Sequence, residues 1–310
     1  MTKLDLSVIM PTKRYGPVIP ILFSGLKNQT LEKESWEVII IDDVPESREK
    51  EAEAHAEKHG ITLQYVHPAK KPYWKSNRNI ANARNHGLML AKGSLIVFVD
   101  DYTWVPPRFL ESHLDTYDVG GYCLIGAVTA VQWTDNPPED FRTLPVQDID
   151  KRAILKGGIR PEGAIDSRTL QGYTEFRGCQ GAWFYCSNAS APLDKIIEAN
   201  GFWEIADCTS EEDLILGMML QRLGCKFWFK SNPDVNACHM AHGKPEMNPK
   251  KIYPEEGCFR VIPDIFKTKN EGSWALLEVF NRNPNLRFNA EMGFDLRKER
   301  EKLENLHVSS

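Results

Sequence analysis

The chain has 310 residues, of which 42% are hydrophobic and 26% are charged. This composition is that of an ordinary soluble globular protein with enough chain to build a core, and it excludes disordered and fibrous proteins. The formal net charge of −5 provides no overall attraction to nucleic acid or to an anionic membrane, so any polyanion has to be bound locally.

The sequence carries none of the usual signals for export or membrane insertion. The first residues lack the long apolar stretch of a signal peptide, and no run of about 18 apolar residues occurs in the chain. We therefore expect a cytoplasmic protein without an integral membrane segment. The seven cysteines are odd in number and include no Cys-x-x-Cys pair, which favours reduced, mostly buried thiols over a disulfide framework or a zinc ribbon.

Short β-branched segments alternate with helical patterns through the first third of the chain. The predicted strands are Leu6–Met10, Trp36–Ile41, Leu63–Val66 and Leu95–Val99, and the predicted helices are Val18–Asn28, Glu46–Lys58 and Asn79–Ala91. This alternation indicates βαβ units, and therefore an α/β fold with a doubly wound, mainly parallel, Rossmann-like sheet flanked by helices. Such sheets bind their ligands beyond the carboxyl ends of the strands.

The second half of the chain is less regular. The apolar run Tyr122–Trp133 predicts one or two buried strands, whereas residues 134–178 form a long polar stretch of the kind that is usually functional in a compact protein. The other predicted elements are helices at Arg108–Tyr117, Pro192–Asn200, Glu211–Leu223, Ser273–Phe280 and Leu296–Leu306 and a strand at Lys226–Phe229. We divide the chain into a nucleotide-binding half (1–105), a metal and acceptor half of the same domain (106–243) and a C-terminal helical extension (244–310).

Pairs of acidic residues directly follow two of the predicted strands. Asp100 and Asp101 end one strand, and Asp42 and Asp43 end another. In a parallel sheet both pairs reach the same edge, where carboxylate oxygens can hold a divalent cation. Each pair is also compatible with a plain turn from a strand into a helix. The presence of two such pairs suggests one shared polar site.

Basic residues are concentrated between these acidic pairs. Between Glu57 and Asp100 the chain contains several lysines and arginines and no carboxylate, which favours an anionic ligand such as a diphosphate, although solvated surface lysines are the alternative. Arg84 differs from the others because it falls inside the apolar stripe of the helix predicted at Asn79–Ala91. An unpaired buried charge is costly, so we expect a partner for this guanidinium.

Three consecutive acids, from Glu211 to Asp213, precede a helix that is apolar nearly all round. Ser210 and Asp213 resemble a capping box, and acids are favoured at the positive end of a helix. The start of a buried helix is also a suitable place for a general base. A structural role at the start of the helix and a catalytic role as general base would each explain these three acids.

Two histidines, His239 and His242, fall in a segment that we predict to be a loop. This spacing can put one or both imidazoles on a metal ion, but it is not the pattern of a helical zinc site. Unrelated loop histidines are the alternative.

Taken in order, these segments resemble the family 2 glycosyltransferases of the GT-A fold, of the inverting and non-processive type. The matching motifs between residues 6 and 243 are SVIMPTKR, VIIIDD, NARNHG, FVDDYTWVPPRFL, GCQGAWFYCSNAS, NGFWE, SEEDLILGMMLQRLG and HMAH. Each motif is weak by itself, whereas the ordered set is specific.

The resemblance implies a role for residues that match these motifs. Those that it places around the nucleotide are Pro11, Thr12, Arg14, Asp42, Asp43, Arg84 and Asp100. It assigns Asp101 and His242 to a Mn²⁺ or Mg²⁺ ion on the donor diphosphate, and it makes Asp213 and Glu212 catalytic residues, with Asp213 as the base. The pocket for the sugar and the acceptor would include Gly181, Trp183 and Asn188.

Three positions depart from the family pattern. Tyr102 stands where many members carry a third acid, and Ile215 and Met219 replace an Asp and an Arg that often follow the Glu-Asp pair. The chain also has no Gln-x-x-Arg-Trp pattern and no membrane spans, which argues against a processive polysaccharide synthase.

The resemblance implies transfer of a single sugar from a nucleoside diphosphate sugar, by family frequency a UDP-sugar, to an acceptor hydroxyl with inversion. The acceptor could be a glycan, a lipid-linked sugar, a protein or a small molecule, and the net charge disfavours nucleic acid. Two alternatives are a nucleotidyltransferase of similar fold and a sugar-nucleotide-binding protein without turnover.

Overall fold

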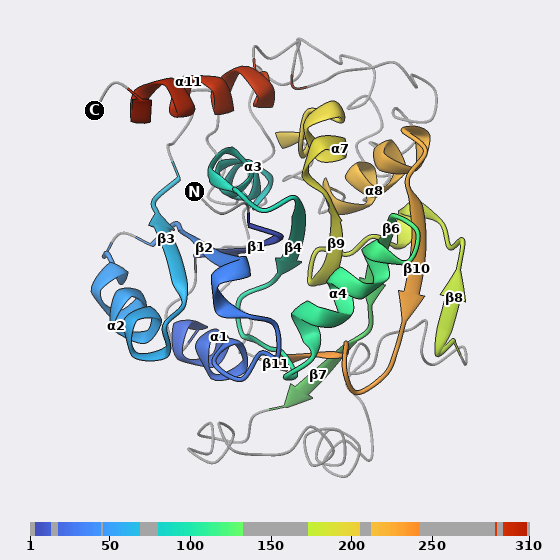
Figure 1. Ribbon diagram of the computed structural model, residues 1–310, viewed down its shortest axis with the longest axis horizontal. Helices are drawn as coiled ribbons and strands as arrows, with labels where there is room; N and C mark the ends of the chain where they lie inside the picture. Colours follow the sequence, from blue (N-terminus) through green and yellow to red (C-terminus); the bar gives the residue numbers. More distant parts are fainter. Residues whose placement is uncertain are drawn as a thin grey trace, which may run out of the picture.

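The structure is a computed structural model that describes residues 4–13, 18–44, 46–68, 80–132, 173–204, 212–241, 289 and 294–308. Its centre is a large sheet with helices on both faces, as Figure 1 shows. The α/β class and the mainly parallel sheet that the sequence predicts are thus confirmed.

The large sheet has eight strands in the order β3-β2-β1-β4-β9-β6-β10-β8. In chain order, the strands are β1 (Leu6–Thr12), β2 (Trp36–Asp42), β3 (Thr62–Val66), β4 (Leu95–Val99), β6 (Tyr122–Gly126), β8 (Glu175–Arg177), β9 (Asn188–Pro192) and β10 (Lys226–Lys230). Only β9, which lies between β4 and β6, and β8, at the edge, run antiparallel to their neighbours. The carboxyl ends of β1, β2, β4, β6 and β10 therefore share one edge of the sheet.

A second sheet lies beyond this edge and consists of β5 (Thr103–Trp104), β11 (Ala237–Ala241) and β7 (Val128–Gln132) in that order. β5 follows β4 after three residues and β7 follows β6 after one, so the small sheet continues from the ends of the central strands. The prediction that His239 lies in a loop is wrong, because His239 is paired with Thr103 in β11.

Helices cover both faces of the large sheet (Figure 1). One face packs against α1 (Val18–Leu26), α2 (Glu49–His59) and α4 (Phe109–Asp118), and the other against α3 (Ile80–Leu90), α7 (Leu193–Glu198), α8 (Glu212–Arg222) and α11 (Leu296–Val308). Each face has its own hydrophobic cluster: the first lies under α1, α2 and α4, and the second under α3, α7, α8 and α11. Alternate residues of a strand point to opposite faces, so Val8 and Met10 belong to the first cluster and Ile9 to the second. Burying both faces explains why the central strands β1, β2 and β4 are mostly apolar.

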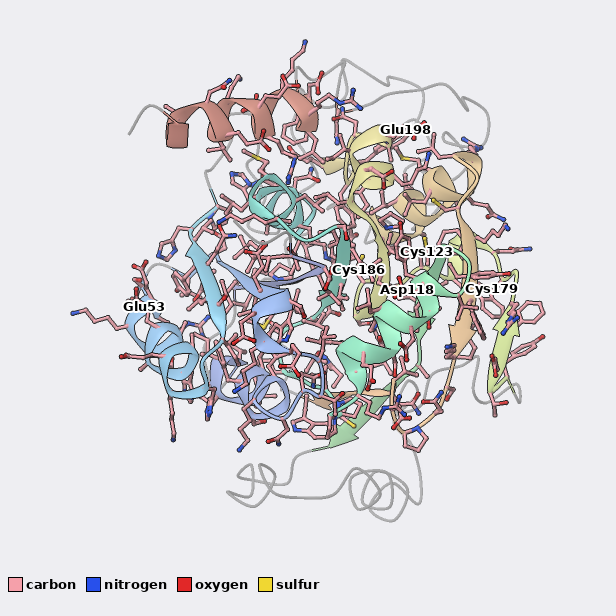
Figure 2. All side chains as sticks on the ribbon, viewed as in Figure 1. Glu53, Asp118, Cys123, Cys179, Cys186 and Glu198 are labelled. Carbon is pink, nitrogen blue, oxygen red and sulfur yellow. The ribbon has the colours of Figure 1, made fainter. Side chains whose placement is uncertain are left out.

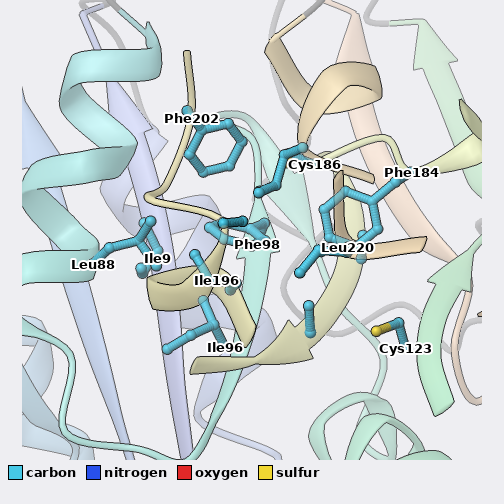
Figure 3. Packing of buried hydrophobic residues seen from close by; sticks show 14 of the residues in the cluster. Ile9, Leu88, Ile96, Phe98, Cys123, Phe184, Cys186, Ile196, Phe202 and Leu220 are labelled. Atoms are coloured by element: carbon cyan, nitrogen blue, oxygen red, sulfur yellow. The ribbon is translucent and has the colours of Figure 1, made fainter. Parts of the chain in front are cut away.

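The second cluster contains a group of aromatic rings at the centre of the molecule. Phe98 of β4 meets Phe184 and Phe202 edge to face, at centroid distances of 6.2 and 5.3 Å (Figure 3). Edge-to-face pairs of this kind add about 0.5–1.5 kcal/mol each to the burial of the rings. The packing fixes the end of β4 relative to two segments that come from much later in the chain.

The C-terminal helix α11 agrees with the helix predicted at Leu296–Leu306 and packs on α3. Its Arg300 donates hydrogen bonds to the carbonyl oxygens of Leu88 and Ala91, at the end of α3. The helix predicted at Ser273–Phe280 lies outside the described residues. Among the helices that the structure describes, none combines the length and apolar character that crossing a bilayer requires.

The cysteines of the described part agree with the expectation of reduced thiols, because all five are free. Cys208 and Cys258 lie outside the described residues.

Candidate active site

The first part of the candidate site is the carboxyl end of β4, where Asp100 and Asp101 leave the sheet. The side chain of Asp100 is 32% exposed, whereas Asp101 is nearly buried and its Oδ2 accepts a hydrogen bond from Thr12 Oγ1 at 3.0 Å. Thr12 ends the neighbouring strand β1, which also contains the buried Pro11. The two strand ends are thereby tied together at the edge where ligands are expected.

Tyr102, which stands where many family members carry an acid, turns the chain away from this edge. Its φ of 57° lies in the left-handed region, which non-glycine residues rarely occupy. The side chain packs against the apolar cluster on the face of α1 and α4. Tyr102 therefore forms part of the turn into β5, and its side chain packs against the core.

The end of β2 brings Asp42 and Asp43 beside Thr12, but Asp42 is already enclosed by protein groups. Its Oδ2 accepts hydrogen bonds from the Tyr65 hydroxyl at 2.7 Å and from Arg48 Nε at 2.8 Å, and its side chain is fully buried. These donors explain Asp42 as a structural group, so we leave it out of the proposed nucleotide pocket. Asp43 is only partly buried, and its backbone N–H donates to the Thr12 carbonyl.

Arg84 of α3 connects the end of β4 to the start of α8. It is 2% exposed, as the apolar stripe of the helix predicts, and its guanidinium lies 5.4 Å from the centre of the Phe202 ring. One nitrogen donates to Asp100 Oδ1 at 3.0 Å and another to Glu212 Oε1 at 2.8 Å. Burial by itself lowers the pKa of Arg84. The surrounding negative groups, Glu212 and Asp100 among them, raise this pKa by more than burial lowers it, so the guanidinium stays charged.

Glu212 and Asp213 begin α8 and have different surroundings. The carboxylate of Glu212 is engaged by Arg84, so its observed role is to form this ion pair. Asp213 Oδ1 accepts from the N–H of Leu214 at 2.8 Å, and its Oδ2 accepts from the N–H of Cys186 at 3.3 Å. Burial, followed by the charge of Glu212, raises the pKa of Asp213 to about 7, although Arg84 and the two N–H groups oppose the shift. A carboxylate with such a pKa is suited to accept a proton near neutral pH.

The loop before β9 holds Asp213 from the other side. This loop contains the 3₁₀ helix η3 (Gly181–Trp183), and the backbones of Gly181 and Gly217 approach so closely that a side chain on either residue would collide with the other. Gln221 of α8 also accepts a hydrogen bond from the Gly181 N–H at 2.9 Å. Cys186, at the end of this loop, is fully buried. Figure 2 shows it at the centre of the molecule, whereas Glu53 and Glu198 lie at the periphery.

Asn188 has a structural environment that does not support a place in the sugar pocket. Its side chain is fully buried, and its Nδ2 donates to the carbonyl oxygens of Ala127 and Val235 at 2.9 and 2.8 Å. Its Oδ1 lies 3.2 Å from Nε2 of His113. Asn188 thus joins β9 to three other segments, and we leave it out of the proposed site. The matching motif gave no sign of this difference, because a buried and an exposed asparagine look alike in a sequence.

The groups available for a divalent cation are the carboxylates at the end of β4. Within the described ranges, no group of three or more His, Cys, Asp or Glu side chains is arranged to hold a metal ion. Asp100 and Asp101 nevertheless suit Mg²⁺ or Mn²⁺ as hard oxygen donors, since one or two carboxylates together with substrate phosphates form a common site for Mg²⁺. His242 and Arg14, the other predicted ligands of the metal and the nucleotide, lie outside the described residues.

Two contacts near the site could not be predicted from the sequence. The hydrogen bond from the Cys186 N–H to Asp213 is a backbone contact that no residue type reveals. His239 is paired with Thr103, two residues after Asp101. Its Nδ1 lies 3.3 Å from the Thr103 hydroxyl. The contact between His239 and Thr103 could be predicted only if Ala237–Ala241 were recognised as a strand.

Comparison with known proteins connects this arrangement to one family. The model of glycosyl transferase family 2 matches residues 7–176, which is more than half of the chain. Poly(ribitol-phosphate) beta-N-acetylglucosaminyltransferase TarP of Staphylococcus aureus is 32% identical over 119 residues, which cover 37% of this chain and 32% of TarP. Validoxylamine A glucosyltransferase of Streptomyces hygroscopicus subsp. jinggangensis is 24% identical over 225 residues, which cover 71% of this chain and 52% of that protein. The chain thus matches about a third of the first relative and about half of the second.

Solved structures show the same fold. TarS of S. aureus in complex with UDP-GlcNAc is 16% identical and superimposes with a TM-score of 0.54, covering 90% of this chain and 72% of that one. GalNAc-T7 with UDP, GalNAc and Mn²⁺ is 12% identical, with a TM-score of 0.52, and covers 78% of this chain and 44% of that one. Given the family match over residues 7–176 and these shared folds, the chain belongs to glycosyltransferase family 2 and has the GT-A fold.

Proposed function

We propose that the protein transfers a single sugar from a UDP-sugar to an acceptor hydroxyl, with inversion at the anomeric carbon. The observation that carries this proposal is the chain of contacts from the end of β4 to the start of α8. Arg84 joins Asp100 to Glu212, and Glu212 is followed by Asp213, whose pKa is raised to about 7. These contacts support a single site in which the donor nucleotide binds at the end of β4 and Asp213 acts as the base.

In this mechanism, Asp213 accepts the proton of the acceptor hydroxyl while the acceptor oxygen forms a bond to the anomeric carbon. The bond from that carbon to the diphosphate oxygen breaks, and the nucleoside diphosphate leaves with the electron pair. General base catalysis of this kind contributes about 10²- to 10⁴-fold to the rate. Attack opposite the leaving group inverts the configuration, which is why no covalent sugar intermediate is required.

We further propose that Thr12, Asp43 and Asp100 line the donor site and that Asp101 binds Mn²⁺ or Mg²⁺. The complexes of TarS with UDP-GlcNAc and of GalNAc-T7 with UDP and Mn²⁺ support a nucleotide and a divalent cation in this fold. A bound cation would neutralise charge on the departing diphosphate. The prediction that His242 also binds the metal is kept as part of this proposal.

The replacement Asp213→Asn tests the base. We expect the variant to bind UDP-GlcNAc or UDP-glucose as the native protein does, and to release UDP at least about 100-fold more slowly. The matched control is Asp118→Asn, which changes an exposed acid at the end of α4. Unchanged UDP release in Asp213→Asn would eliminate the base role. Release of pyrophosphate from a nucleoside triphosphate would instead support a nucleotidyltransferase.

A further inference from the structure

Exposed aromatic side chains gather beside the loop that holds Asp213. Tyr173, Phe176 and Tyr185 are 37%, 42% and 41% exposed. Trp183 joins them, with its ring centroid at 5.6 Å from that of Tyr173 and at 6.0 Å from that of Phe176. We call Tyr173, Phe176, Trp183 and Tyr185 the aromatic platform. In the described part of the chain only two other large apolar side chains are exposed, Val119 and Leu306.

The core of the protein sets the direction in which the platform points. Phe184 is fully buried against Phe98 and Phe227, whereas its neighbour Tyr185 is 41% exposed and Trp183 is partly buried against the core. Trp183 is further fixed by an edge-to-face contact with Phe229 of β10, at 6.0 Å. Trp183 of the platform is thus held by a buried neighbour, while Tyr173, Phe176 and Tyr185 are partly exposed. Clustered exposed rings of this kind mark a binding surface.

The platform is continuous with the candidate base. Tyr185 directly precedes Cys186, whose N–H donates to Asp213 Oδ2. At the other end of the same loop, Gly181 packs on Gly217 of α8, the helix that begins with Glu212 and Asp213. The loop that carries Trp183 and Tyr185 therefore also contacts the carboxylate that would accept the proton.

The chemistry of the platform suits an uncharged ring. Phe176 and Arg177 are neighbours on β8 and face opposite ways: Phe176 contacts Trp183, whereas the Arg177 guanidinium lies 3.8 Å from the centre of the Trp228 ring. The platform therefore presents ring faces and two tyrosine hydroxyls, and in the described part of the chain the neighbouring cation, Arg177, is turned to Trp228 instead. A phosphate group requires cations or clustered N–H donors, whereas the C–H face of a sugar stacks on aromatic rings and its hydroxyls bind tyrosine hydroxyls.

We propose that the aromatic platform is the acceptor subsite and that the acceptor is a neutral glycan. One sugar ring stacks on the platform, and the hydroxyl that receives the new sugar faces Asp213. This inference rests on the proposed function, to which it adds the class of acceptor and the residues that select it.

The test is saturation-transfer NMR of the full chain with UDP and Mn²⁺, using four probes. Three are neutral, namely maltotetraose, tetra-N-acetylchitotetraose and mannotetraose, and one is an anionic oligomer of ribitol phosphate. We expect saturable binding of at least one neutral oligosaccharide. In the double variant Phe176→Ala with Tyr185→Ala the dissociation constant should rise at least 10-fold. The control Leu306→Ala removes an apolar side chain on α11 that is 65% exposed, more than Phe176 or Tyr185, and should bind as the native protein does.

A second variant separates stacking from folding. Phe176→Tyr keeps the ring and should retain binding, whereas Phe176→Ala should lose it while the melting temperature stays the same, because the side chain is 42% exposed. The proposal is overturned if no neutral oligosaccharide binds, if the double variant binds as the native protein does, or if only the ribitol phosphate oligomer binds. UDP binding is measured in each sample: its absence from the native protein would contradict the proposed function, whereas UDP binding with a negative oligosaccharide result would contradict only the acceptor subsite.

Discussion

Removing the charge of Arg84 should damage both the stability of the protein and the base. The guanidinium is 3% exposed, and it pairs with Glu212, which is 7% exposed, and with Asp100, which is 32% exposed. In Arg84→Gln the carboxylate of Glu212 is left buried without its cation, whereas Asp100 keeps contact with water. Breaking a buried ion pair costs about 3–5 kcal/mol. This loss is a large part of the stability of about 5–15 kcal/mol that native proteins have.

A double-mutant cycle measures how much of this loss comes from the ion pair. Because Arg84→Gln with Glu212→Gln removes both charges, we expect the double variant to be less destabilised than the sum of the two single variants. The free energy of unfolding in urea is the measured quantity. If the two single losses simply add, the contact between Arg84 and Glu212 contributes no coupling and the account of the buried pair is wrong.

The same substitution should shift the pH dependence of the reaction. Arg84 lowers the pKa of Asp213, which burial raises to about 7. Its loss should raise this pKa further, so the acidic limb of kcat/KM against pH moves to higher pH. Arg84→Lys keeps one charge but cannot bond to both carboxylates as a guanidinium does, so its shift should be smaller. An acidic limb that stays in place in Arg84→Gln would refute the electrostatic link.

Three further predictions concern the same region. Asp101→Asn should abolish stimulation of UDP release by Mn²⁺, as EDTA does in the native protein; activity that resists EDTA would contradict the metal proposal. Asn188→Ala should lower the free energy of unfolding by about 2–4 kcal/mol, since the carbonyls of Ala127 and Val235 lose a buried donor; a stability equal to that of the native protein would show that these bonds contribute nothing. Asp213→Asn should stabilise the protein at pH 8. The folded pKa of Asp213 is raised, so ionising this carboxyl costs stability progressively as the pH rises from about 4 to about 7 and fully above that. The gain should vanish near pH 4, and an equal gain at pH 4 and pH 8 would contradict the pKa shift.

The parts of the fold that follow a period could be predicted. β1, β2 and β4 are buried on both faces and are mostly apolar, and the predicted strands end within two residues of the observed ones. Arg84 was placed inside a buried helix face from spacing alone, and a partner for it could be predicted as well. Its partner Glu212 could not, because the two residues are 128 positions apart and no local pattern joins them.

The parts that depend on tertiary contacts were missed. β9 has the sequence NASAP, which contains no β-branched residue and ends in proline, yet all five residues are buried between β4 and β6. Small residues suit a strand that is packed closely on both faces, but they are also common in turns. The sequence of β11 likewise resembles a loop, because the strand depends on its pairing with β5 and β7 and not on the β-propensity of its own residues.

The central claim is that the ends of β1 and β4 and the start of α8 form one site for a UDP-sugar and a divalent cation. A crystal structure of the protein with UDP and Mn²⁺ tests this claim most directly. The account predicts the ion beside Asp101, with the diphosphate on the side of the sheet edge that Asp213 faces. A nucleotide bound elsewhere, with Asp101 and Asp213 remote from it, would contradict the account.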